Sequence, residues 1–404
     1  MSSVGGAGSI PGTVPAGSRF KNTLRVQLTR KLGRGLQMIH DSRRQRLARK
    51  MQQRSLDAMI ITSPTSIFYL TGLTPSAPPG MVISSEPKAI PVLVVREIEV
   101  EDVRKVSPFP VEGAPLGTNG AAQLAAAVRS LVGASARVAF DDDVMVASKL
   151  RLLQETIGSA TLVAASDLIM ELRMIKDDEE ISVMREAATV SDRAMLAAVE
   201  AIRAGKTECD AAIAAEATWR SHGLGPAYEV LIGSGKRSAA LRRFPSLVVP
   251  AEGELVRFDF AARVSPAAGF GYNNDLTRTF TRGKPSPENL SLLTAGLAVF
   301  EGILSEIMPG RTIGEVANRG LRAVNGTKYM QWTKIMGHGI GADVAEPPAF
   351  IAGSEFVMQP GNCFAIEPMI TVPGEKGVCF ENVVVVTEQG SESLNQLELR
   401  LWGG

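Results

Sequence analysis

Five residues in the second half of the chain combine acidic or imidazole groups with surroundings where such groups are unusual. Asp259 lies inside the apolar run LVRFDFAA, Glu367 inside CFAIEPMI and Glu381 inside GVCFENVVVV. A carboxylate in the middle of an apolar strand is costly to bury unless it is paired or bound to a metal. Asp275 belongs to GYNNDLTRTF, and His338 stands between two glycines in GHGIG. A single such carboxylate is usually a satisfied structural group, but three on separate strands beside a glycine-flanked histidine favour one shared site.

Four carboxylates and one imidazole have the stoichiometry of a dinuclear metal centre. Two divalent ions carry four positive charges, which four carboxylates neutralise. A water that bridges two such ions loses a proton near neutral pH and becomes a nucleophile. An oxygen-rich set with one imidazole suits manganese, cobalt, iron or zinc better than a thiolate-binding metal. We therefore expect two divalent ions, held by Asp259, Asp275, His338, Glu367 and Glu381.

Strand patterns dominate the region that must position these ligands. LVRFDFAARV, GNCFAIEPMITV and GVCFENVVVVTEQG are β-type runs, and two segments with helical periodicity lie between the first run and the second. Ahead of them, IKDDEEISVMREAATVSDRAMLAAVEAIRAG predicts a long amphipathic helix, because acidic residues crowd its first turn and Gly205 follows its end. We expect this helix to open the second domain, over residues 171–404.

The first half of the chain alternates short apolar runs with helical stretches. LDAMIITS, AIPVLVV and ARVAF read as strands, and GAAQLAAAVRSLV reads as a helix. This alternation predicts an α/β domain over residues 41–170. Residues 1–40 form a tail rich in Gly, Ser and Pro, followed by a basic arm. The arm reads as a solvated helical face, with contact to a partner subunit as the alternative.

Composition limits the class of protein. A chain of 404 residues is long enough for two domains with sizeable cores. A net charge of +1 gives no reason to expect a nucleic acid or an anionic membrane as partner. No run of eighteen apolar residues predicts a transmembrane helix, and the N-terminal sequence has no signal-peptide h-region. Cys209, Cys363 and Cys379 show no zinc or redox spacing, which fits a reducing cytoplasm.

Several of these motifs together resemble the superfamily of creatinase, prolidase, aminopeptidase P and methionine aminopeptidase (M24 peptidases). SPTSIFYLTGL is similar to its N-terminal domain and LRMIKDDEEISVMREAATVSDRAM to its domain-joining segment and first catalytic helix. GYNNDLTRTF, GHGIG, FAIEP and FENVVVVTEQG are similar to its successive metal motifs. The resemblance spans about residues 45–395. It implies an α/β (α+β) fold, with a creatinase-type N-terminal domain and a C-terminal pita-bread catalytic domain.

The resemblance also implies roles for the ligands. Asp259 would chelate one ion, Asp275 and Glu381 would bridge both, and His338 and Glu367 would complete the second. Glu367 is counted among the catalytic residues as well. The resemblance further implies cleavage of a C–N bond, and a homodimer whose N-terminal domains help to cover the active sites.

The sequence departs from the family pattern at positions that matter for catalysis. The first ligand motif reads DFA instead of DxG. Ala345 takes the place of a histidine that precedes the acidic-proline pair, and Arg242 stands where a second, substrate-contacting histidine is expected. Cys379 replaces an arginine two residues before Glu381, and alternation along a strand predicts that both face the same side. Loss of one transition-state donor costs ~10²–10³ in rate, so these changes indicate an altered substrate.

Arg242, at one of these departures, and its neighbour Arg243 suggest what that substrate carries. Arg242 and Arg243 cannot act as bases, because a guanidinium stays protonated, but they can clamp an anion. We therefore expect a metal-dependent hydrolase that cleaves an amide-type C–N bond, through a metal-bridging hydroxide, in a small, anionic, non-standard substrate. The alternatives are an Xaa-Pro dipeptidase or aminopeptidase with altered helper residues, a non-catalytic pita-bread binding protein, a metal-free creatinase-like enzyme, and a lyase acting at the same metals.

Further residues are candidates for contact with a small-molecule or short-peptide substrate. Tyr272, three residues before Asp275, is a candidate proton donor, with a packed aromatic as the alternative. Arg242 is a candidate for both catalysis and substrate binding. Arg243, Tyr69, His222 and Cys379 are candidates for substrate binding. The thiol of Cys379 has no visible neighbour that would depress its pKa and make it reactive.

Overall fold

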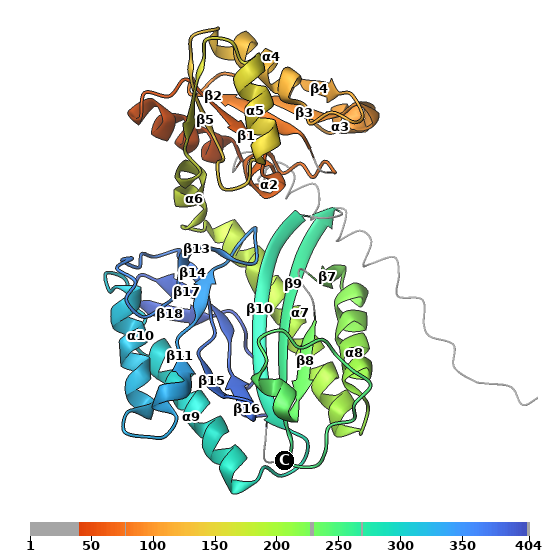
Figure 1. Cartoon of the computed structure of the whole chain (residues 1–404), viewed down its shortest axis with the longest axis vertical. Helices are drawn as coiled ribbons and strands as arrows, with labels where there is room; N and C mark the ends of the chain where they lie inside the picture. Colours follow the sequence, from red (N-terminus) through yellow and green to blue (C-terminus); the bar gives the residue numbers. More distant parts are fainter. Residues whose placement is uncertain (1–39, 77, 227–229, 268–269, 402–404) are drawn as a thin grey trace, which may run out of the picture.

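The computed structural model describes residues 40–76, 78–226, 230–267 and 270–401, so the predicted tail and nearly all of the predicted basic arm lie outside the described residues. The chain folds into two domains of mixed α/β structure, which confirms the expected fold class (Figure 1). Helix α6 (Asp167–Arg173) leads from the first domain to the second. None of the helices in the described ranges has the length and apolarity needed to span a membrane.

The N-terminal domain is built on a six-stranded sheet in the order β4-β3-β2-β1-β5-β6. Strand β1 pairs antiparallel with β2 and parallel with β5. The strands are β1 (Ala58–Ile61), β2 (Gly80–Ser84), β3 (Val92–Arg96), β4 (Val111–Ala114), β5 (Arg137–Phe140) and β6 (Thr161–Ala164).

Helices cover both faces of this sheet, which explains why its strands read as continuous apolar runs. Met59 and Ile61 of β1 pack in one core with the helix over residues 40–53, with α2 and with α6. Ala58 and Ile60 pack in a second core with α4 and α5 on the other face. The helices are α2 (Pro64–Thr71), α3 (Val100–Arg104), α4 (Ala121–Val132) and α5 (Ala147–Thr156).

The C-terminal domain has two halves, each with helices on its outer side (Figure 1). In the first half, α7 and α8 pack against the long hairpin β9–β10. A capping box between Asp177 and Glu180 begins α7, as the acidic first turn predicted. The elements are α7 (Asp178–Arg203), α8 (Glu208–Ser221), β7 (Leu224–Pro226), β8 (Leu231–Ser234), β9 (Leu255–Ala267) and β10 (Phe270–Thr281).

In the second half, α9 (Pro287–Leu304) and α10 (Ile313–Leu321) share one apolar core with the strands beside them. One sheet runs β13-β12-β14-β17-β18 and a smaller one runs β11-β15-β16. The strands are β11 (Thr333–Lys334), β12 (Gly337–Gly339), β13 (Glu346–Ala349), β14 (Cys363–Ile366), β15 (Met369–Val372), β16 (Lys376–Cys379), β17 (Asn382–Thr387) and β18 (Gly390–Ser393).

Candidate metal centre

The register of the β9–β10 hairpin places two of the expected ligands on one face. Asp259 lies opposite Thr277, and Asp275 lies opposite Ala261. Directly opposed residues of an antiparallel pair point to the same side, and alternate residues along a strand share a face. Asp259, Asp275 and Thr277 therefore share one face. Phe260 points to the opposite face, where it packs among the side chains of α7 and α8.

The other three expected ligands come from the second half of the domain. His338 lies on β12, and Glu367 follows β14, the strand that pairs with β12. Glu381 lies between β16 and β17, and its backbone N–H donates to the carbonyl of Thr277 on β10 at 3.0 Å. The Thr277 hydroxyl also donates to Glu381 Oε2 at 2.8 Å. This contact joins the two halves of the domain at the acidic cluster.

The geometry of the cluster fits a bound cation. One ligand atom from each of Asp275, His338 and Glu381 lies within 4.8 Å of the others. His338 Nε2 is 3.9 Å from Asp275 Oδ2 and 3.7 Å from Glu367 Oε1. Glu381 Oε1 is buried and has no hydrogen-bond partner among the described residues. An orphaned carboxylate oxygen within an oxygen-rich set is the arrangement that a divalent cation satisfies.

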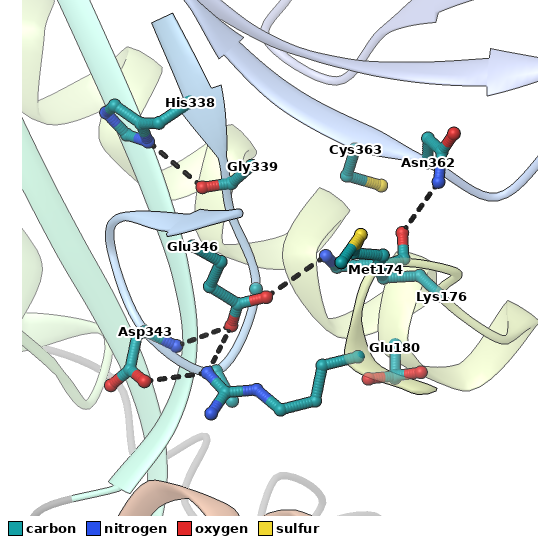
Figure 2. A network of polar contacts seen from close by, with 12 residues as sticks. Met174, Lys176, Glu180, His338, Gly339, Asp343, Glu346, Asn362 and Cys363 are labelled. Atoms are coloured by element: carbon teal, nitrogen blue, oxygen red, sulfur yellow. Dashed lines mark hydrogen bonds and ion pairs between the residues drawn. The ribbon is translucent and has the colours of Figure 1, made fainter. Parts of the chain in front are cut away.

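The tautomer of His338 follows from its backbone contact. Its Nδ1 lies 3.0 Å from the carbonyl oxygen of Gly339 (Figure 2). Because a carbonyl only accepts, Nδ1 carries the proton, and Nε2 presents its lone pair to the carboxylates. Burial lowers the pKa of His338, so that the ring is neutral at neutral pH. A neutral imidazole with Nε2 directed at acids is suited to metal ligation.

The carboxylates repel one another in the absence of a cation. Burial raises the pKa of Asp275 and of Glu381 well above the usual range, and nearby carboxylates raise both further. Burial and the charge of Asp259 raise the pKa of Glu367 to about 8. Asp259 therefore belongs to the same electrostatic cluster. A divalent cation would hold all four groups in their charged forms.

Arg243 contacts the cluster from the direction of β8. Its side chain is buried, and its guanidinium donates to Asp259 Oδ2 at 3.2 Å and to the carbonyl of Leu241 at 2.7 Å. The structure therefore places Arg243 behind a proposed ligand. Arg242, the next residue back, has an exposed side chain.

Cys379 lies beside Glu367, with its Sγ 3.6 Å from the Glu367 carbonyl oxygen. Burial raises the pKa of the thiol well above its usual range, and the charge of Glu367 raises it further. Cys379 is consequently a neutral thiol at the edge of the cluster.

The structure does not bring Tyr272 to the cluster. Its side chain lies on the face of β10 opposite to Asp275, because the two positions differ by an odd number along a regular part of the strand. The hydroxyl donates to Glu180 Oε1 at 2.7 Å, and the ring packs edge-on against Phe68. Tyr272 is therefore not placed as a proton donor at the metals, and the alternative of a packed aromatic describes this residue.

Tyr69 and His222 are likewise held elsewhere. Tyr69 is buried in the core of the N-terminal domain, where its hydroxyl donates to the Leu172 carbonyl at 3.1 Å. His222 is exposed at the end of α8, and its ring contacts the Thr218 carbonyl at 2.9 Å. Helix α8 packs on the face of β9 opposite to the acids, and Tyr69 is enclosed in the N-terminal core, so the structure places both residues away from the acidic cluster.

Two arginines that the sequence analysis did not single out flank Asp259 on the same face of β9. Arg257 is buried, and its guanidinium contacts Met369 Sδ at 2.7 Å and the Ala240 carbonyl. Arg263 is half-buried, and its Nε donates to Asn273 Oδ1 at 3.0 Å. Alternation in the run RFDFAAR was the available signal, since residues two and four positions from Asp259 share its face.

Comparison with known proteins finds a family match for each domain. Residues 182–388 match metallopeptidase family M24, and residues 43–175 match the creatinase/prolidase N-terminal domain.

The chain is also similar to individual dipeptidases and to a prolidase of known structure. The chain is 27% identical to a Xaa-Pro dipeptidase of Pyrococcus horikoshii over 87% of this chain and 96% of that protein. It is 34% identical to a probable dipeptidase PepE of Mycobacterium tuberculosis over 63% of this chain and 66% of that protein. The crystal structure of the prolidase from Pyrococcus horikoshii OT3 matches with a TM-score of 0.78 and 26% identity, over 89% of this chain and 99% of that one.

Proposed function

Because the chain belongs to metallopeptidase family M24, we propose that it hydrolyses the amide C–N bond of a short peptide or small amide that carries a negative charge. The observation that supports this most directly is the convergence of Asp275, His338 and Glu381 around a carboxylate oxygen without a partner in the described part of the chain. The family implies a dinuclear metal site there, and manganese, cobalt, iron and zinc all suit its donor set.

The chain's own residues have distinct roles in the proposed reaction. Asp259, Asp275, His338, Glu367 and Glu381 would hold the two ions. When bound, such ions supply Lewis acidity and lower the pKa of water. Thr277 orients Glu381 by its hydrogen bond to Oε2. Glu367 is the carboxylate proposed to accept a proton and return it to the leaving amine.

Charge balance supports an anionic substrate. Four carboxylates neutralise two divalent ions, and the guanidinium groups of Arg243 and Arg257 then leave the buried site with excess positive charge. Arg263 adds a third guanidinium on the same face, at a half-buried position. A substrate carboxylate would offset this charge, and a planar guanidinium is suited to bind it.

The test begins with metal removal and reloading. The protein is stripped with a chelator, and manganese, cobalt, iron(II) or zinc is added back before assay on dipeptides and on their C-terminal amides. We expect activity only after reloading, with about two ions per chain, and faster turnover of the free acids. Full activity in the stripped protein would contradict the proposal.

An Xaa-Pro dipeptidase is the second candidate, favoured by the relatives in Pyrococcus horikoshii. A panel of Xaa-Pro dipeptides, matched Xaa-Ala dipeptides and acidic amides separates the two candidates. Ordinary turnover of several Xaa-Pro dipeptides would establish the second candidate and remove the non-standard substrate from the first. Turnover confined to acidic amides would do the reverse.

We further propose that the chain acts as a homodimer in the cytoplasm. Its cysteines, Cys209, Cys363 and Cys379, are all unpaired, which suits a reducing compartment. We also propose the domain division near residue 170.

A further inference from the structure

A buried group of charges lies beside the hairpin that carries His338. Figure 2 shows Glu346 with Lys176 on one side and the backbone of Asp343 on the other. Glu346 Oε1 accepts hydrogen bonds from Arg173 at 2.6 Å and from the Asp343 N–H at 2.9 Å, and Oε2 lies 3.3 Å from Lys176 Nζ. The side chains of Arg173, Lys176 and Glu346 are all at most 2% exposed. We call these four residues the Glu346 network.

The network fixes Glu346 as a charged group. Although burial opposes its ionisation, the charges of Arg173 and Lys176 lower the pKa of Glu346 to about 2. Displacement of a buried carboxylate that is paired with two cations and a backbone donor is unfavourable, because each lost contact leaves a buried charge unpaired. The position of Glu346 is therefore set by Arg173 and Lys176.

The backbone transmits that position to His338. Glu346 begins β13, and it pairs with Gly339 of β12, the residue next to His338. The Gly339 carbonyl accepts the Nδ1 proton of His338 and so sets the direction of Nε2. The turn between the strands packs directly on the charges, since a Cβ at Gly341 would lie 2.8 Å from Lys176 Cε. A shift of Glu346 would thus rotate or displace the imidazole.

The same network joins the hairpin to the N-terminal domain. Arg173 ends α6, and its guanidinium also donates to the Ser66 hydroxyl at 3.3 Å and to Asp343 Oδ2 at 2.7 Å. The Thr65 hydroxyl donates to Asp343 Oδ1 at 2.7 Å. Ser66 and Thr65 both belong to α2, so that Arg173 is held by one domain while it holds the other.

We propose that Arg173 is a positioning residue that aligns His338 with the other metal ligands by fixing Glu346, and that it thereby makes the metal centre depend on the docking of the N-terminal domain. The inference rests on the proposed metal site for its consequence. Residues that support a ligand without touching the metal typically contribute 10–100-fold to metal affinity or activity.

The test follows His338 directly. The chain has three histidines, His40, His222 and His338, so that a nitrogen-15 spectrum of labelled histidine gives a small, assignable set of signals. Zinc, which is diamagnetic, is titrated into the full chain, and the His338 signal is read together with kcat, KM and the unfolding temperature. In the unsubstituted protein we expect the Nε2 signal of His338 to shift on zinc binding.

Two substitutions at Arg173 decide the matter. Arg173→Met is expected to weaken zinc binding at His338 by ~10–100-fold and to lower kcat by a similar factor, with little change in KM. Arg173→Lys keeps the charge but lacks the guanidinium fork that spans Glu346, Asp343 and Ser66. Its zinc affinity and kcat are expected to lie between those of the unsubstituted protein and those of Arg173→Met. Arg185→Met removes an exposed pair with Glu392 and is expected to match the unsubstituted protein.

The outcomes separate this inference from the proposed function. If His338 of the unsubstituted protein does not respond to zinc, the proposed metal site itself is wrong. If it responds, and Arg173→Met binds zinc and turns over substrate as the unsubstituted protein does, the positioning role is overturned. Arg173→Lys decides alone where Arg173→Met does not fold.

Discussion

At the scale of single residues, Glu381 has two carboxylate oxygens with different surroundings. Oε2 accepts from Thr277, and Oε1 is buried without a partner in the described part of the chain. A buried acceptor that lacks a donor is unfavourable in the absence of a cation. Glu381 Oε1 is therefore an acceptor that a bound metal ion would satisfy.

Glu381→Gln tests this difference. Glutamine keeps the shape but removes the charge, so we expect metal affinity and turnover to fall by at least ~100-fold, beyond the usual effect of residues that only support a ligand. Metal content is measured by elemental analysis and activity on the best dipeptide. Glu392→Gln, an exposed glutamate on β18, serves as control, and retention of two ions in Glu381→Gln would contradict the assignment.

Arg263 is the residue that best tests the charge of the substrate. Loss of a hydrogen bond to a charged group costs about 1.5–3 kcal/mol, so Arg263→Gln is expected to raise KM for a dipeptide with a free carboxylate by ~10–100-fold. KM for the matching dipeptide amide should change little. Arg220→Gln, on the surface of α8, is the control. Equal effects on acid and amide would remove Arg263 from substrate binding.

The residue types predicted the cluster, but side-chain direction decided the rest. Asp259, Glu367 and Glu381 were found because carboxylates are rare inside apolar strands, and His338 because glycines flank it. Tyr272 was proposed from its distance along the chain, whereas its odd offset from Asp275 turns it toward Glu180. Arg263 was missed, although it lies four positions after Asp259 and alternation along β9 therefore predicts that it shares the face of Asp259.

At the scale of elements, the β12–β13 hairpin is packed too closely to accept side chains at its glycines. A Cβ at Gly339 would lie 2.4 Å from the Pro347 carbonyl oxygen and 2.8 Å from that of Glu346. The glycines of GHGIG therefore allow two strands to pack closely. Glycine beside a ligand often has another role, in which it lets the backbone approach the metal ion closely.

Gly339→Ala is expected to destabilise the catalytic domain by about 1–3 kcal/mol, the usual cost of overpacking, and to weaken metal binding. Urea unfolding and elemental analysis measure the two effects. Gly225→Ala is the matched control, because a Cβ there meets no atom within 4 Å. Equal stability of the two variants would show that the hairpin opens without cost.

The N-terminus of α7 carries a buried acid with a pH-dependent contribution to stability. Burial raises the pKa of Glu180 from 4.5 to about 7, despite the charge of Arg43 and the hydrogen bond from Tyr272. The folded state therefore binds this proton more tightly than the unfolded state. The free energy of unfolding from this group is greatest below about pH 4.5, falls as the pH rises to about 7, and is level above that.

Glu180→Gln removes that slope. We expect the free energy of unfolding of the unsubstituted protein to fall by on the order of 3 kcal/mol more than that of Glu180→Gln between pH 5 and pH 7.5. Urea unfolding in the presence of a chelator measures both. Glu186→Gln, at an exposed position of the same helix, should keep the full slope. Parallel pH profiles for the protein and Glu180→Gln would contradict the prediction.

Periodicity predicted the elements better than it predicted their contacts. The long helix α7, its acidic first turn and the strand runs around the ligands were all legible in the sequence. The pairing of β12 with both β13 and β14 was not, because these strands have only three or four residues each and carry little alternation. Pairing of such short strands is decided by tertiary contacts such as those of Glu346.

At the scale of the whole molecule, the two domains are tied by buried charges on both sides of the domain junction. Arg43 belongs to the helix over residues 40–53, and its Nη2 lies 2.7 Å from Asp177 Oδ2 and 3.3 Å from Glu180 Oε2. Arg173 supplies the second tie through Asp343 and Glu346. The match of each half to a known domain anticipates two units, but not that their contact reaches the metal centre.

The proposed homodimer is tested on the unsubstituted protein. Sedimentation velocity at several concentrations is expected to give a mass of about twice the 42.9 kDa of one chain, with no change on metal removal. A mass of one chain at the highest concentration would contradict the proposal.

The location of Arg173 at the end of α6 limits how this architecture can be recombined. A chimera that joins only the residues after Arg173 to a foreign first half would inherit Asp343 and Glu346 without the guanidinium that pairs with them. A graft would therefore need Arg173 together with Thr65 and Ser66, although these last two residues lie in α2 of the first domain. Because of these contacts, neither domain can be exchanged for that of another protein independently of the other.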